Sequence, residues 1–221
     1  MSAPTTKEAA EKINKILNEF GVPPLHGTVL ADPQNASPEI VLAMVLDSMI
    51  KARPISHELT QRTIKKLIEA DYHDIDVLSK STWEDRTKVL QEGSYNRYRE
   101  QCATNLGELA KLVVERYDGD LNNLLKQAAG KIDKARILLK EVRGMGDLAV
   151  EVFFNNVQGI WPSIAPCLDS RSLKTAAEIG IGTDLGKIYN VLERDPVRMS
   201  RFANGLSEVR LEKRQDLIEE L

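Results

Sequence analysis

Two places in this chain carry residue types and spacings that could do chemistry. The first is Gly144-Met145-Gly146, where two glycines flank an apolar residue between two helix-like segments. Glycine permits positive φ and close approach of the backbone to another group, and the N–H groups that open the next helix can bind an anion without a basic side chain. The second is Asp169, which precedes a short helix-like segment. A carboxylate there caps the helix and stays ionised because the helix dipole favours its charge.

The elements that must position these residues are expected to be α-helices throughout. Apolar residues recur mostly three and four positions apart, and the alternating runs typical of strands are scarce. Ser37 and Pro38 begin a nearly all-apolar helix, which we expect to be buried. Ser81 and Glu84 have the spacing of a capping box, and a long amphipathic helix follows over residues 95–117. The predicted fold class is therefore all-α.

The composition excludes several kinds of protein. The formal net charge of −3 argues against a surface that binds nucleic acid everywhere, while it leaves room for a local basic face. No apolar run approaches the ~20 residues of a membrane span, and residues 1–12 lack a signal-peptide pattern. We expect a soluble, intracellular monomer without a membrane partner, nuclear if the source is a eukaryote.

Cysteine and histidine usage argues against a metal site. The two cysteines, Cys102 and Cys167, cannot build a four-cysteine zinc or iron–sulfur centre. The three histidines, His26, His57 and His73, are scattered without ligand spacing. No metal site is therefore predicted.

The glycine segment by itself also fits an ordinary tight turn between two helices. Taken together with Asp169 and the turn "EGSYNRYR" at residues 92–99, it resembles the helix-hairpin-helix DNA glycosylase superfamily, which includes bacterial endonuclease III and the alkyladenine glycosylases. The stretch "VLAMVLDSMIKARPIS" at residues 41–56 is similar to the buried helix of that superfamily and the loop after it. The resemblance covers roughly residues 38–185.

This resemblance implies an architecture and an activity. It implies two helical lobes with a cleft between them: a central lobe over residues 38–150, ending in a helix-hairpin-helix at 131–158, and a second lobe from 1–37 plus 151–221. The implied activity is that of a monofunctional DNA glycosylase, which excises a damaged or mismatched base from duplex DNA in base excision repair. Two alternatives stay open: a non-enzymatic DNA-structure binder with a degenerate active site, and a helical protein-interaction domain.

The resemblance also assigns roles to residues. Asp169 is the implied catalytic residue, which stabilises positive charge on the deoxyribose or helps water attack it, as carboxylates do in glycoside hydrolysis. The implied DNA contacts are the hairpin residues and the residues where a wedge into the base stack would begin. The hairpin residues are Gly144, Met145 and Gly146, and the wedge would begin at Met49, Ile50 and Lys51. Tyr95 is a candidate for the base pocket. The plainer interpretations are that Asp169 is only a helix cap and that Met49 and Ile50 only end a buried helix.

The chain departs from the superfamily next to the hairpin. Leu148 stands where bifunctional members carry the lysine that forms a Schiff base, so no lyase activity is expected from this position. Lys140 and Lys174 are the nearby amines, and neither has the matching spacing. Asp147 places a negative charge at the hairpin, which a bound monovalent cation could screen. Apart from that cation, no cofactor is expected.

Overall fold

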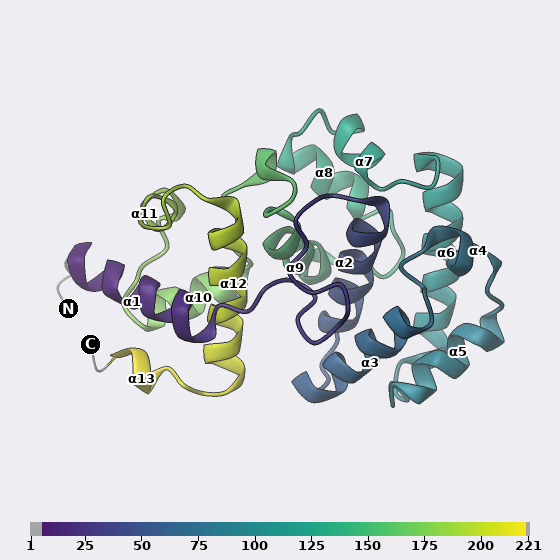
Figure 1. Ribbon diagram of the computed structural model, residues 1–221, viewed down its shortest axis with the longest axis horizontal. Helices are drawn as coiled ribbons and strands as arrows, with labels where there is room; N and C mark the ends of the chain where they lie inside the picture. Colours follow the sequence, from purple (N-terminus) through teal and green to yellow (C-terminus); the bar gives the residue numbers. More distant parts are fainter. Residues whose placement is uncertain (1–5, 220–221) are drawn as a thin grey trace. The chain divides into compact units, whose positions relative to one another are not determined.

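A computed structural model describes residues 6–219, and all regular structure within them is helical (Figure 1). This confirms the all-α prediction. None of the helices in this range combines the length and the apolar character that a bilayer crossing requires. The α-helices are α1 (Thr6–Phe20), α2 (Pro38–Lys51), α3 (His57–Glu69), α4 (Ile75–Lys80), α5 (Trp83–Glu92), α6 (Arg99–Tyr117), α7 (Asn122–Gln127), α8 (Ile132–Leu139), α9 (Asp147–Val157), α10 (Ser170–Glu178), α11 (Leu185–Val191), α12 (Pro196–Leu211) and α13 (Asp216–Glu219), with a single 3-10 turn, η1, at Pro162–Ile164.

The helices form two compact units, one of residues 25–153 and one of residues up to 24 together with those from 154 onward. The sequence predicted 38–150 for the first lobe and 1–37 plus 151–221 for the second, of which residues 1–5 and 220–221 lie outside the described range. The loop at 25–37 lies in the first of these units. One reason is a hydrogen bond of 2.8 Å from Asn122 Nδ2 to the carbonyl oxygen of Ala36.

The unit of residues 25–153 is built on α2. Its residues 41–50 are all buried, as the all-apolar pattern predicted, and it packs against α3, while α6 packs against α4 and α5. Ser37 caps α2 as expected, with Pro38 at the first helical position. The expected capping box before α5 is displaced by one residue, because Thr82 and Asp85 form it instead of Ser81 and Glu84. The hydroxyl of Ser81 instead donates to the carbonyl of Leu78, which closes α4.

The other unit places the helix that follows Asp169. Helix α12 packs against both α1 and α10, and a Cβ at Gly205 would lie 2.8 Å from Ile16, so α1 and α12 approach closely there. Lys12 on α1 is 5% exposed and donates from Nζ to the carbonyl oxygen of Ile179 at 3.2 Å. A cation at this end of α10 is favourable because the helix dipole is negative there. The C-terminal end of α10 is thus fixed to α1.

Candidate active site and hairpin

Asp169 is the N-cap of α10, as the sequence predicted. Its Oδ1 accepts hydrogen bonds from the backbone N–H groups of Arg171 at 2.9 Å and Ser172 at 3.0 Å. The hydroxyl of Ser172 donates a further hydrogen bond to Oδ2. Asp169 is only 3% exposed, so its negative charge is stabilised inside the unit by these donors and by the helix dipole.

Asn155, which the sequence analysis did not single out, holds Asp169 from α9. Asn155 Nδ2 donates to Asp169 Oδ2 at 2.6 Å, and the backbone N–H of Asp169 donates to Asn155 Oδ1 at 2.9 Å. These reciprocal bonds fix both the position and the orientation of the carboxylate. The available signal was the run Asn155-Asn156-Val157-Gln158, because amides at the end of an apolar helix must find partners once they are buried.

Gln158 fixes the loop just before Asp169 in the same manner. Its Nε2 donates to the carbonyl oxygen of Cys167 at 3.0 Å, and its Oε1 accepts from the N–H of Cys167 at 3.0 Å. Gln158 is fully buried. The polar residues at the end of α9 therefore hold the loop that leads into α10, and Asn155 is the one that touches Asp169.

Helix α12 supplies further neighbours of this site. Ser207 Oγ lies 3.5 Å from Ser172 Oγ. Arg210, one turn further along α12, interacts electrostatically with Asp169: burial lowers the pKa of the Arg210 guanidinium, the charge of Asp169 raises it, and the charge of Arg171 lowers it. The carboxylate thus has a cation nearby as well as neutral donors.

This arrangement suits electrostatic stabilisation better than proton transfer. Within residues 6–219, four hydrogen bonds reach the carboxylate of Asp169, and a carboxylate offers about four lone-pair sites. None is left to take a proton from water while these bonds stay intact. The negative charge itself still acts on any positive charge that develops close by.

The first hairpin glycine faces its own protein. Gly144 has φ of +98°, and a Cβ built there would lie 2.7 Å from Asn105 Nδ2 and 3.0 Å from Met49 Cε. Only glycine therefore fits this position without displacing a neighbour. Asn105 is 3% exposed and comes from α6, so it supports the hairpin from inside the unit.

The second hairpin glycine faces open space. A Cβ at Gly146 would meet no atom within 4 Å. Gly146 directly precedes α9, whose first N–H groups have no partner within the helix. Between the glycines, Met145 is 2% exposed and its sulfur accepts a hydrogen bond from Ser48 Oγ at 3.6 Å, so it anchors the hairpin inward.

Asp147, the acidic residue that departs from the superfamily pattern, is matched by a cation. Lys140 Nζ donates to Asp147 Oδ1 at 2.7 Å. This hydrogen bond and the positive charge of Lys140 hold the pKa of Asp147 below its usual value. A monovalent cation is therefore not needed at the hairpin to compensate the charge of Asp147.

The residues expected to form the wedge belong to the core. Met49 is 4% exposed and Ile50 is fully buried, so neither side chain reaches out of the surface in this structure. They lie in the last turn of α2, whose residues 41–50 are all buried. Lys51 is partly exposed, and its Nζ lies 2.7 Å from Oδ2 of the buried Asp47. The plainer interpretation of Met49 and Ile50 as the end of a buried helix is the one that fits.

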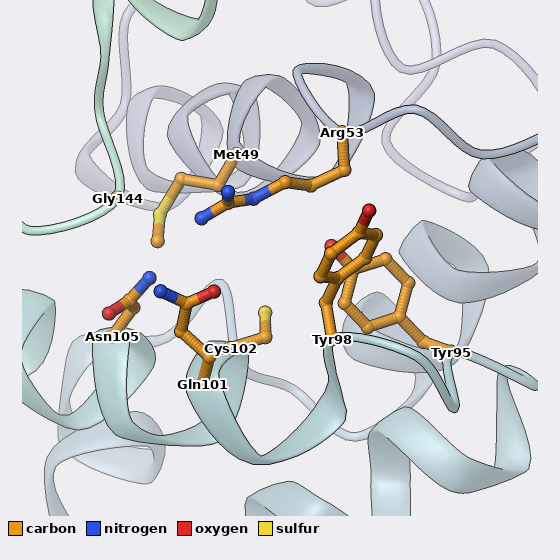
Figure 2. A pocket seen from close by; sticks show the side chains of 8 residues that line it. All are labelled: Met49, Arg53, Tyr95, Tyr98, Gln101, Cys102, Asn105 and Gly144. Carbon is orange, nitrogen blue, oxygen red and sulfur yellow. The ribbon is translucent and has the colours of Figure 1, made fainter.

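Tyr95 lines a small pocket behind the hairpin (Figure 2). The pocket has a volume of about 10 Å³, which is about the space of one water molecule. A nucleobase therefore does not fit while the side chains lie as they do. Burial raises the pKa of the Tyr95 phenol, and it raises that of the Cys102 thiol to about 12. The residues around the pocket are Met49, Arg53, Tyr95, Tyr98, Gln101, Cys102, Asn105 and Gly144.

A cluster of cations and aromatic rings borders this pocket. The guanidinium carbons of Arg53 and Arg97 lie 5.6 Å and 5.2 Å from the ring centroid of Tyr98. Both distances are within the range of cation–π attraction. Figure 2 shows Arg53 extending over the pocket and Tyr98 standing at its edge. Tyr95, Arg97 and Tyr98 are neighbours in the sequence, but Arg53 joins them only in the folded chain.

Comparisons with known proteins identify the fold. No family model matches this chain, and no curated protein matches it significantly in sequence. The structure is similar to that of the 3-methyladenine DNA glycosylase MagIII of H. pylori, which was solved bound to 1,N6-ethenoadenine. The match has a TM-score of 0.56 at 14% sequence identity, and it covers 93% of this chain and 98% of that one. The fold is thus that of a helical DNA glycosylase.

Proposed function

We propose that this protein is a DNA glycosylase that excises a damaged or mismatched base from duplex DNA and leaves an intact abasic site. The observation that carries the proposal is Asp169, a buried carboxylate held by several donors at the start of α10. Similarity of the whole fold to a DNA glycosylase supports it. So does the hairpin, whose Gly146 faces open space beside the first N–H groups of α9, where an anion such as a phosphate would be favoured.

The surroundings of Asp169 favour one mechanism over another. Loss of the base leaves positive charge on the deoxyribose, and a nearby fixed negative charge stabilises that cation. Because the lone pairs of Asp169 are already occupied, it does not serve as the base that deprotonates water. Stabilising the sugar cation does not by itself assist the departing base. Bases that leave readily, such as alkylated purines that already carry positive charge, are therefore the preferred substrate class.

The rival function is a binder of DNA structures that does no chemistry. The burial of Asp169 and its hydrogen bonds are also compatible with this rival, because a residue that only caps a helix would look the same. The two functions differ in one result, which is the release of a base. A variant of Asp169 that keeps the helix cap and removes the negative charge distinguishes the two functions.

The direct test is a panel of duplexes, each with one lesion, incubated with the protein and then heated in alkali. We expect strand breaks at a subset of lesions, with 3-methyladenine and 1,N6-ethenoadenine as the first substrates to try. A duplex without a lesion is the control. If the protein binds these duplexes but no lesion in a broad panel becomes alkali-labile, the DNA-structure binder is the better description.

The same substrates test the absence of lyase activity. A Schiff base needs a neutral amine at the sugar carbon, and Leu148 offers none. The other amines considered are ion-paired, since Lys140 Nζ lies 2.7 Å from Asp147 and Lys174 Nζ lies 3.6 Å from Glu178. We expect no covalent protein–DNA band after borohydride treatment. A trapped band that disappears when one lysine is replaced would overturn this expectation.

A further inference from the structure

The neighbour that fixes Asp169 is an amide on another helix. Asn155 is 3% exposed. It both donates to the carboxylate of Asp169, at 2.6 Å, and accepts from the backbone N–H of the same residue, at 2.9 Å. The cap bonds from Arg171 and Ser172 would hold an Asp169 side chain in place without Asn155. The additional pair is therefore not needed for capping.

We propose that Asn155 is a positioning residue, which orients the Asp169 carboxylate by holding Oδ2 in place. This inference rests on the proposed function for its consequence in catalysis. The contact itself belongs to the structure of the unit. An amide suits the task because it supplies one donor to the carboxylate and one acceptor to the N–H without adding charge. A carboxylate at the same place would have the same shape and would repel Asp169.

The other groups around Asp169 come from elements other than α9, so a change at Asn155 does not remove them. Arg171 and Ser172 lie on α10 itself, and Ser207 and Arg210 come from α12. The thiol of Cys167 is nearby in the loop and donates to the carbonyl of Phe154 at 3.2 Å. Asn155 is the contact from α9, so its replacement leaves the cap and the α12 groups in place.

Asn155→Asp should make base excision depend on pH. At low pH the new carboxyl is protonated and its O–H donates to Asp169 as the amide did. Like charges that share a site raise the pKa at which such a pair loses its shared proton. Once pH rises above that pKa, the two carboxylates repel each other and Asp169 is displaced. Single-turnover excision should stay within about tenfold of wild type near pH 5 and fall about 100-fold below it by about pH 8.

A matched control separates positioning from simple loss of stability. Gln158 clamps the same loop through Cys167 and also donates to the backbone carbonyl oxygen of Asn155 at 3.0 Å, but these hydrogen bonds do not involve the carboxylate of Asp169. Gln158→Glu should lower the melting temperature as pH rises, because its new carboxylate faces the carbonyl of Cys167. Its folded fraction should excise bases at the wild-type rate. If Gln158→Glu and Asn155→Asp show the same pH profile per folded molecule, Asn155 is only structural.

A second measurement needs no turnover. Duplexes containing a cationic pyrrolidine or a neutral tetrahydrofuran in place of the target sugar report the charge effect of Asp169. Wild type should prefer the cationic duplex. At about pH 8 the preference of Asn155→Asp for the cationic duplex should be about tenfold smaller than that of wild type. The preference of Gln158→Glu should equal that of wild type. An unchanged preference in Asn155→Asp refutes the positioning role.

The failure of the proposed function would look different. Wild type would then release no base and show no preference for the cationic duplex. In that case the 13C resonance of the Asp169 carboxyl still tests the contact. In Asn155→Asp it should titrate together with the new carboxyl as a coupled pair. Titration as in the wild-type protein would show that Asn155 does not control this carboxylate.

Discussion

Asp169→Asn is expected to lower base excision by at least about 100-fold, because it removes the negative charge that stabilises the sugar cation. Capping by itself would leave the melting temperature almost unchanged, since Asn caps a helix nearly as well as Asp. The structure changes this expectation. The new amide would place one donor against another at the 2.6 Å contact with Asn155 Nδ2. We therefore expect a loss of about 1–3 kcal/mol in the free energy of unfolding.

The reciprocal variant Asn155→Asp/Asp169→Asn separates these two effects. The amide at position 169 can donate to the carboxylate at position 155, and that carboxylate still accepts the N–H that now contacts Asn155 Oδ1. The melting temperature should return close to that of wild type while excision stays lost, as thermal unfolding and single-turnover assays would show. Recovery of excision along with stability would mean that a carboxylate at position 155 replaces that of Asp169, so that excision requires the negative charge and not its place at position 169.

Gly146→Val is expected to weaken binding to duplex DNA by about tenfold or more and to change stability by no more than about 0.5 kcal/mol. The side chain would enter open space in the free protein, since no atom lies within 4 Å of the new Cβ. It would instead prevent close approach of a phosphate to the N–H groups at the start of α9. Fluorescence anisotropy with a labelled duplex and thermal unfolding measure the two effects. If the variant binds DNA as tightly as wild type, the hairpin is only a turn between two helices and does not contact the phosphate.

Gly144→Ala is the matched variant with the opposite expectation. Its Cβ would meet Asn105 Nδ2 at 2.7 Å and Met49 Cε at 3.0 Å, at a φ of +98°. Strain and overpacking should together cost about 2 kcal/mol or more in the free energy of unfolding. Adding Asn105→Ala should restore part of this loss by relieving the closest contact. If Gly144→Ala is as stable as wild type, the close packing behind the hairpin is not rigid.

Several elements could be predicted from the sequence because their causes are local. The cap at Asp169 depends on a side chain and the two N–H groups that follow it, and the burial of α2 follows from its unbroken apolar run. The hairpin was recognisable because two glycines interrupt a helical pattern. The capping box before α5 was displaced by one residue because Ser, Thr, Glu and Asp at neighbouring positions offer similar local bonds.

Contacts between distant residues could not be predicted in this way. The sequence could not show that Gly144 faces Asn105 while Gly146 faces open space, since both glycines have the same local signal. It placed Met49 at the start of a wedge, and packing buries it instead. The sequence by itself determined that the chain forms helices, where α2 begins, and that a carboxylate caps α10. Only the tertiary structure decided that Asn155 orients this carboxylate, because the partner of a buried amide depends on which helices pack together.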